Sequence, residues 1–472
     1  MLNDKIHTVL FAAYAGLFFW LPIPLGSKYP WSISVMEIWV YLLTIAVVWL
    51  LASKRLPIPD TLKNNKTPLL LISAATLWIG FQCLPLPASL LSFFSPAAAL
   101  IHSTVTNPGA SISLDASITS LQLQKSLALT LLVALTLILV HSRQRLQWLA
   151  YVIIASAFIQ ALAAITLELS GIQYNIDQYT YSSNAIIHSG GRATGFYSNP
   201  DHLAGWLEMA LAIGVGLLIS MLHRMHFSNW QQRIRHYAQT LLGPKARLRI
   251  ILIILCIALV MTHSRMGNSA FFISLMVSGI LFLILSRHAS KSVSIFIISL
   301  IILDIVIIGS WFGFQKVVQR VEQTTMEAEA SRGDVYVDSY AMIDSFKLSG
   351  IGAGNYFSAF PGYKQDGPNY YIDHVHNDYL ELVLELGLLG TIPLALLVLL
   401  SLAYAIRALK QRRSGLILGM NFAAIMGTTS ILIHSSVDFN LQVPANAALF
   451  TTLIAIPFVC HQLKHQPHHH TT

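Results

Sequence analysis

The chain has 472 residues, of which 55% are hydrophobic and only 11% are charged. Soluble domains carry about 25% charged residues, so this composition excludes an ordinary soluble domain and favours a membrane protein. The net charge of +8 does not indicate a nucleic-acid partner. The basic residues lie in short stretches between long apolar runs, as they do in the cytoplasmic loops of membrane proteins.

Apolar runs long enough to cross a bilayer, which takes about 20 residues, recur along the whole chain. No small-residue cleavage site follows the first run, which favours a first span over a signal peptide. The predicted spans cover roughly residues 8–23, 33–52, 67–85, 121–140, 148–168, 200–222, 249–263, 268–286, 292–312, 378–405, 415–434 and 443–460. About twelve spans predict an all-α fold, a polytopic transmembrane helix bundle.

Charge assigns a side to each connection between spans. Lysine and arginine gather in alternate connections, which the positive-inside rule places in the cytoplasm together with both termini. The other connections then face the periplasm. The predicted organisation is nine spans in residues 1–312, a periplasmic loop in 313–377, three spans in 378–460 and a histidine-rich cytoplasmic tail in 461–472. Histidine tracts can bind metal, but a flexible tail is the favoured interpretation here.

The loop 313–377 contains a helical pattern. Its apolar and aromatic residues recur near helical spacing and are followed by the glycine-rich stretch "SGIGAGNY". This pattern predicts an amphipathic helix that lies against the outer face of the membrane domain and is followed by a tight turn. The residues of the predicted face are Val335, Tyr336, Ser339, Tyr340, Ile343 and Phe346.

Three arginines stand on the side where basic residues are few. Arg192 lies in "GGRATGFYSNPDHLAG", Arg265 in "THSRMGNSAFF" and Arg332 in "SRGDVYVDSY". A single outer arginine ordinarily reaches lipid headgroups. Arg265, however, lies in a tight connection and is expected to point into the bundle. Three converging guanidinium groups would bind a strongly anionic group such as phosphate. In the same stretch, Ser198 and Asn199 are both candidate N-caps of the following span.

In the stretch "HVHNDYLELVLELGLLG", a predicted span begins with several polar and ionisable residues. Histidine can take a proton from a hydroxyl near neutral pH, so His376 is a candidate general base, the alternative being a helix cap. Asn377 and Asp378 are expected to shape the turn. On a helix, Glu381 and Glu385 share one face with Asp378. Glu385 lies below the interface, so it should pair with an arginine, bind a cation or stay protonated, and a structural ion pair is the simplest interpretation. We expect Glu381 and Glu385 to orient arginines from neighbouring spans.

A second polar turn is predicted in "IHSSVDFNLQVPANA", between the last two spans. It carries His434 and Asp438, and we expect it to pack against the turn that contains His376.

Together these stretches resemble the O-antigen ligase / O-antigen polymerase superfamily. "HNDYLELVLELG" is similar to its H-N-x-x-L-x-x-x-x-E-x-G signature. "RATGFYSNPDHLAG", "SRMGNSAF", "GIGAGNYF" and "HSSVDFNLQVPANA" look like its other marked segments in the same order, with a core over about residues 190–400. Relatives often have proline where Ser349 stands, which affects the expected geometry of this loop.

The resemblance implies transfer of a glycan from undecaprenyl-pyrophosphate to an acceptor on the periplasmic face of the bacterial inner membrane. It also implies that His376 is the general base and that Arg192 and Arg265 bind the donor pyrophosphate, with Arg332 a weaker match. The implied acceptor is lipid A-core or a growing glycan, hence a ligase or a polysaccharide polymerase. A pilin or protein O-oligosaccharyltransferase is an alternative.

The chemistry of the residues agrees with this expectation. Pre-placed arginines can stabilise a leaving pyrophosphate without a metal, and the sequence has no Asp-x-Asp pair. We therefore expect a metal-independent, inverting transfer with no cofactor. A lipid transporter or flippase is the alternative of another class. Transporters usually have repeated halves and midplane sites, whereas here the marked residues gather on the outer side. A purely structural scaffold would leave the outer arginines unexplained.

Overall fold

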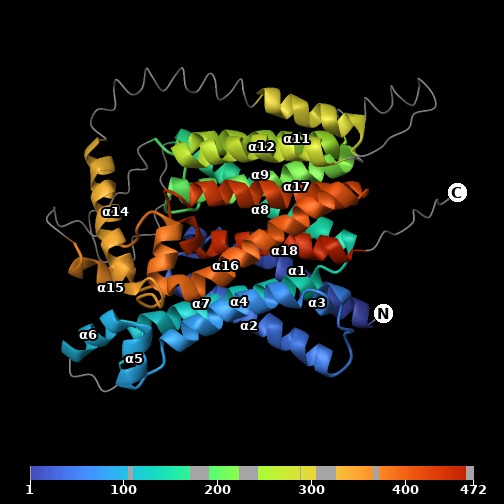
Figure 1. The fold of residues 1–472 in the computed structure, drawn as a ribbon. Coiled ribbons are helices and arrows are strands. Elements are labelled where there is room, and N and C mark those ends of the chain that lie inside the picture. Colours follow the sequence, from blue (N-terminus) through green and yellow to red (C-terminus); the bar gives the residue numbers. More distant parts are fainter. Residues whose placement is uncertain are drawn as a thin grey trace, which may run out of the picture.

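The computed structural model describes residues 2–104, 110–170, 191–222, 243–286, 289–303, 326–364 and 372–463, apart from the side chains of residues 2–4 and 326–334. Within these residues the chain forms helices and no strand. Figure 1 shows the long helices side by side, with α5, α6, α14 and α15 gathered beyond one end of the bundle.

The long helices follow the apolar runs of the sequence. They are α1 (Leu2–Trp20), α2 (Pro30–Ala52), α4 (Lys66–Gln82), α7 (Ala116–Leu139), α8 (Arg143–Ser170), α9 (Pro200–Leu222), α11 (Pro244–Met261), α12 (Arg265–Leu285), α16 (Asp378–Gln411), α17 (Gly415–His434) and α18 (Pro444–Gln462). The other elements are η1 (Leu25–Ser27), α3 (Asp60–Lys63), α5 (Ala88–Phe94), α6 (Pro96–Thr104), α14 (Met326–Phe346), α15 (Tyr356–Ala359), η4 (Phe360–Gly362) and η5 (Asn440–Gln442).

Among the described residues, eight helices are long and apolar enough to cross a membrane: α2, α7, α8, α9, α12, α16, α17 and α18. The fold is therefore the predicted all-α polytopic bundle. The remaining predicted spans coincide with α1, α4, α11 and the shorter apolar helix Lys291–Leu303. Because α4 has only 17 residues and α11 has three basic residues among its first six, the count of about twelve spans stays a prediction.

Three helices form the centre of the bundle. The most apolar windows of α9, α17 and α18 are 83%, 78% and 94% buried, against 33% for α2 and 28% for α16, which lie at the periphery. Small residues let α9 and α17 approach closely. A Cβ added to Gly419 would lie 2.0 Å from the carbonyl oxygen of Gly216. Close backbone approach through glycine is a common way for membrane helices to pack, and here it brings α9 and α17 together near the ends that lie away from His202 and His434.

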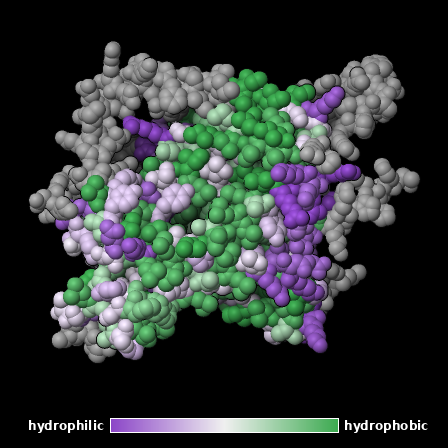
Figure 2. All heavy atoms as spheres, viewed as in Figure 1, coloured by the Kyte–Doolittle hydropathy of each residue, from purple (hydrophilic) through white to green (hydrophobic). Residues whose placement is uncertain are grey.

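The bundle has two polar ends, separated by an apolar belt (Figure 2). We call the end that carries α14 and α15 the His376 end, because the Tyr336 hydroxyl of α14 donates to the His376 carbonyl at 3.0 Å. The connections 86–120 and 313–377 meet here, as the amide of Asn355 donates to the Ser113 hydroxyl at 2.8 Å. Their placement at one end agrees with the alternation that the charge pattern predicts.

At the opposite end, which we call the His7 end, the described parts of two connections rich in lysine and arginine come together. Residues 57–61, 138–144 and 462–463 lie there around His7. The amide of Asn64 in the connection after α3 donates to the Gln462 side chain at 3.1 Å. Which end faces the periplasm stays a prediction.

The helix predicted in the loop 313–377 is present as α14. Ser339, Met342 and Phe346 are buried on one face, as an amphipathic helix requires. Tyr340 was predicted on this face, but it is 62% exposed. It follows Ser339 by one residue, so a helix turns it about 100° away from the packed face.

The glycine-rich turn that follows α14 packs into a break in α16. Gly387 has φ 62° inside this helix, so the helical hydrogen bonds are interrupted there. The turn replaces them, since the Ile351 N–H donates to the Leu384 carbonyl at 2.9 Å. The indole of Trp78 donates to the Leu386 carbonyl at 2.7 Å. The first two turns of α16, which follow His376, are thereby tied to the outer loops.

Candidate active site

The residue after His376 starts α16. Asn377 is the N-cap, and its side-chain oxygen accepts from the N–H groups of Tyr379 and Leu380 at 3.0 and 3.1 Å. A cap of this kind stabilises a helix by about 1 kcal/mol. The amide of the same side chain donates to the Ser436 carbonyl at 2.9 Å. Asn377 thus fixes both the start of α16 and its contact with the turn between α17 and α18.

Asp378 makes a second link to that turn. Its buried carboxylate accepts from the Ser435 hydroxyl at 2.6 Å and from the Leu441 N–H at 3.1 Å. Its backbone N–H points to the Ser435 carbonyl at 2.9 Å. The two polar turns therefore pack directly on each other.

His376 lies where these two turns meet. Its φ of 57° is in the left-handed region, which costs a non-glycine residue of order 1–3 kcal/mol and is typical of functional sites. Its Nδ1 is 3.7 Å from Oδ1 of Asp438, and its side chain is 32% exposed. The ring meets the Phe439 ring edge to face, with centroids 4.8 Å apart. One nitrogen is thus directed at a buried carboxylate, while part of the ring stays accessible.

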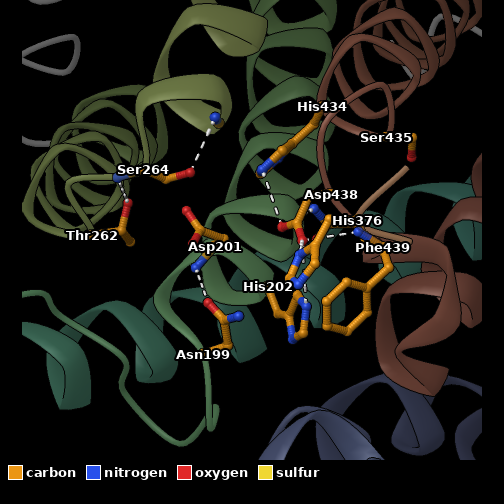
Figure 3. Close-up of polar contacts among 12 residues, drawn as sticks. Asn199, Asp201, His202, Thr262, Ser264, His376, His434, Ser435, Asp438 and Phe439 are labelled. Carbon is orange, nitrogen blue, oxygen red and sulfur yellow. Dashed lines mark hydrogen bonds and ion pairs between the residues drawn. The ribbon is translucent and has the colours of Figure 1, made fainter. Parts of the chain in front are cut away.

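Asp438 is the centre of the cluster. Figure 3 shows three imidazole rings around it: besides His376, Nε2 of His202 is 4.0 Å from Oδ1 and Nε2 of His434 is 3.7 Å from Oδ2. Burial opposes ionisation of Asp438. The contact with His376, the fields of His202 and His434 and the Phe439 N–H outweigh that effect and hold the pKa of the carboxyl below its usual range. The carboxylate is therefore charged at neutral pH.

A second carboxylate lies deeper in the bundle. Nδ1 of His434 is 3.0 Å from Oε1 of Glu208, and the Ser430 hydroxyl donates to Oε2 of Glu208 at 2.7 Å. Both His434 and Glu208 are almost completely buried. Because the other nitrogen of His434 faces Asp438, the Glu208–His434 pair holds the imidazole in a fixed orientation towards the site.

Arg192 lies at the same end of α9. Its Nη2 donates to Asp201 at 2.7 Å and its Nε donates to the Thr262 carbonyl at 2.9 Å. The Asn199 side chain accepts from the Asp201 N–H at 2.8 Å, so of the two predicted caps it is Asn199 that caps α9. Asp201, which Arg192 contacts, directly precedes His202 of the Asp438 cluster in α9.

Arg265 begins α12, three residues after the carbonyl that Arg192 contacts. The sequence predicted that Arg265 points into the bundle, but the residue is exposed. It occupies the first helical position after the Ser264 cap, where a long side chain can leave the bundle. Gly267 brings this helix start close to the cluster, since a Cβ there would lie 3.0 Å from the His434 ring. Arg332 lies in α14, and its side chain is outside the described residues.

Glu381 and Glu385 have other partners than the predicted arginines. Glu381 contacts Nδ1 of His374 at 2.7 Å and accepts from the Val375 N–H at 3.0 Å. Glu385 accepts from the Tyr356 N–H at 3.4 Å. One helical face directs both carboxylates at hydrogen-bond partners in the folded loops above α16, and Lys125 of α7 interacts electrostatically with both. Burial lowers the pKa of His374, but its hydrogen bond and ion pair with Glu381 outweigh burial, and the pKa is raised.

Three residues of the candidate active site were not identified from the sequence. His202 lies inside a quoted motif without a role, and Glu208 is an ionisable residue in an apolar span, which is by itself a signal of function. Lys28 lies in the connection between α1 and α2, and its Nζ is 5.8 Å from the centre of the Phe439 ring. The predicted topology already places this connection on the outer side.

The described residues contain no group of three or more His, Cys, Asp or Glu side chains arranged to hold a metal ion. A cavity of about 480 Å³ lies at the His7 end, lined by residues that include His7, Asp60 and His141. It is at the opposite end of the bundle from Asp438, so it is separate from the candidate site.

Among known protein families, residues 250–395 match a family model described as O-Antigen ligase. The comparison with curated proteins gave no match. The matched segment contains Arg265, α14 and His376, whereas Arg192, His434 and Asp438 lie outside it.

Proposed function

We propose that this chain, whose residues 250–395 match the O-antigen ligase family model, transfers a glycan from undecaprenyl-pyrophosphate to an acceptor hydroxyl at its His376 end. The family match and the apolar helices support a multi-pass membrane protein of the glycosyltransferase type. The proposal adds the donor, the site and the chemical step. It places the His376 end in the periplasm and both termini in the cytoplasm, in a bacterial inner membrane.

One observation carries the proposal. His376 is partly exposed, and its Nδ1 faces the buried carboxylate of Asp438 at 3.7 Å. A carboxylate on one ring nitrogen selects the tautomer in which the other nitrogen is a free base, and it stabilises the imidazolium that forms when this nitrogen takes a proton. The contact tightens when substrate binds, as catalytic hydrogen bonds often do.

The proposed step is a direct displacement. The acceptor oxygen forms a bond to the anomeric carbon, and the bond from that carbon to the pyrophosphate oxygen breaks with inversion. The hydroxyl proton moves to Nε2 of His376, and the electron pair of the broken bond stays on the lipid pyrophosphate. Arg192 and Arg265, with Arg332 assisting, hold that leaving group, since guanidinium groups bind phosphate oxygens and stay charged. The step uses only side chains of this chain.

Arg192 is already paired with Asp201, so it can bind a phosphate only through donors that this pair leaves free. The ion pair at 2.7 Å occupies one side of the guanidinium, and Nε donates a hydrogen bond to the Thr262 carbonyl. The guanidinium is still about one-third exposed, and its planar fork has five N–H donors. The two protein contacts therefore orient Arg192 and leave donors for a phosphate.

Acceptor identity separates the members of the superfamily. Lipid A-core makes the protein a ligase, a growing glycan makes it a polymerase, and a pilin makes it a protein O-oligosaccharyltransferase. The buried pairs around Asp438 do not differ between these cases, because the acceptor is recognised by the outer loops.

The test is a transfer assay with purified protein in detergent. Undecaprenyl-pyrophosphate-linked glycan is mixed separately with lipid A-core, with a second glycan and with pilin. We expect a glycosidic product with one acceptor and release of undecaprenyl pyrophosphate in equal amount. A lipid flippase would leave the donor intact in detergent and would move it across the membrane of reconstituted vesicles, and that result would exclude the proposal.

A further inference from the structure

Lys28 is a basic residue at the candidate site that belongs to neither turn described above. It is exposed in the connection between α1 and α2. Its ammonium lies over the ring of Phe439, 5.8 Å from the centroid. The same ring stacks on His374 with centroids 4.3 Å apart and touches His376 edge to face. Lys28 is thus one aromatic ring away from the candidate base.

The connection that carries Lys28 is held in place by close packing. A Cβ on Gly26 would lie 2.6 Å from the Tyr197 ring and 3.0 Å from a methyl group of Val443, and Gly26 has φ 69°. The Ser27 hydroxyl donates to the Leu21 carbonyl at 2.7 Å. The backbone at Lys28 is therefore fixed against α18 and the segment before α9, while its side chain stays exposed. In the described part of the chain, no carboxylate lies within ion-pair distance of the ammonium.

An apolar groove starts below this connection. It lies between α1 and α2, has a volume of about 480 Å³ and is lined by Ala13, Val35, Ile38, Trp39, Leu42, Leu43 and Ala46. On α2, Trp31 precedes Val35, Ile38 and Leu42 at helical spacing, and all four are exposed. The apolar stripe therefore begins three residues after Lys28 and continues along α2. Ala46 lies about 22 Å along the axis from Trp31 at 1.5 Å per residue.

Exposed apolar residues are expected on every helix that faces lipid, so they do not by themselves define a site. This surface differs because it is hollow and because its upper end leads to an ammonium beside Phe439. A cation at the membrane surface above an apolar groove matches a ligand with an anionic head and a long hydrocarbon chain. A lipid pyrophosphate has this chemistry.

We propose that Lys28 binds the diphosphate of the lipid-linked donor and that the groove between α1 and α2 holds the donor's hydrocarbon chain. This inference rests on the proposed function and adds the path of the lipid. The ammonium approaches the leaving group from the α1–α2 side, whereas Arg192 and Arg265 belong to the α9 and α12 side. The diphosphate then lies between two sets of cations, with His376 beside the sugar that it carries.

The first test concerns the charge. Lys28→Ala should lower kcat/KM for the lipid-linked donor about tenfold, the size expected for one hydrogen bond to a charged group. Lys28→Arg should retain most of the activity. Lys347→Ala is the matched control, because Lys347 is an exposed lysine at the same end. Equal effects of Lys28→Ala and Lys347→Ala would overturn the assignment, since they would reflect only the loss of net charge.

The second test concerns the groove. Ala46→Phe fills its lower part and should raise KM for the full-length donor several-fold. It should have little effect on a donor analogue whose chain is too short to reach Ala46. Ile45→Phe is the control, since Ile45 faces lipid beside the groove without lining it. A phospholipid acyl chain in the groove would make Ala46→Phe change thermal stability in added phospholipid and leave both donor KM values unchanged, which would contradict the inference.

The same assay separates this inference from the proposed function. If wild-type protein transfers glycan and His376→Ala does not, while the Lys28 and Ala46 variants behave like their controls, the lipid path is wrong and the proposed function stands. If His376→Ala transfers glycan at the wild-type rate, the proposed function itself is wrong.

Discussion

The two polar ends of the bundle differ in how their charged groups are arranged. At the His376 end, three histidines from three segments surround one buried carboxylate, and a further buried pair, Glu208–His434, lies beneath it. At the His7 end there is a cavity of about 480 Å³, where the rings of His7 and His141 meet edge to face with centroids 5.4 Å apart. The comparison shows that convergence of ionisable groups from distant segments, rather than cavity volume, identifies the candidate chemistry.

The largest effect should come from the partly exposed histidine. His376→Ala removes the proposed general base and should lower kcat by about 10²–10⁴-fold. His141→Ala, at the other end, should change kcat less than about twofold. This imidazole is hydrogen-bonded to the Ile138 carbonyl at 3.0 Å and lies far from Asp438. Initial rates at matched amounts of membrane-inserted protein measure both. Similar losses in the two variants would remove the distinction between the ends.

The next largest effect should come from the carboxylate. Asp438→Asn keeps the size of the side chain but removes the charge that stabilises protonated His376, so kcat should fall about 10²-fold. The donor KM should change little, because Asp438 is buried and faces His376 rather than the arginines proposed to bind the pyrophosphate. The two constants are read from a donor titration. A rise in donor KM without a fall in kcat would show that Asp438 acts in binding instead.

A structural effect should follow at the deeper pair. Glu208→Leu leaves His434 and Ser430 without their buried acceptor and should lower the free energy of unfolding by about 3 kcal/mol. Ser430→Ala removes one hydrogen bond of the same carboxylate and should cost about 1 kcal/mol. Thermal unfolding in detergent shows which of the two variants is less stable. An equally stable Glu208→Leu protein would show that the pair does not hold the site.

Local sequence patterns predicted most of the fold and part of the candidate site. Apolar runs located the long helices because a bilayer requires them, and the Asn199 cap and α14 followed from local signals. Partners distant in sequence were missed. Glu381 meets His374 because the chain folds back before α16, and Glu208 meets His434 because α9 and α17 pack through glycines. Neither contact follows from spacing along one helix.

The smallest effect should be a pH dependence of the outer turn. The pKa of His374 is raised in the folded state by Glu381, so the stabilisation is complete below the unfolded pKa, near 6.5. It is lost as pH rises through the folded value. The unfolding midpoint of the wild type should therefore fall by more than that of His374→Gln between mildly acidic and mildly alkaline pH. Parallel curves for the two proteins would show that the pair contributes no stability.

The most direct test of the central claim is to locate the bound donor. An undecaprenyl-pyrophosphate-linked glycan with a photoreactive group on its sugar is bound to wild-type protein, irradiated, and the labelled peptides are identified by mass spectrometry. The account predicts labels in the segments that contain Arg192, Arg265 and His376. Labels in the segments that line the His7 cavity, with the His376 end unlabelled, would contradict it.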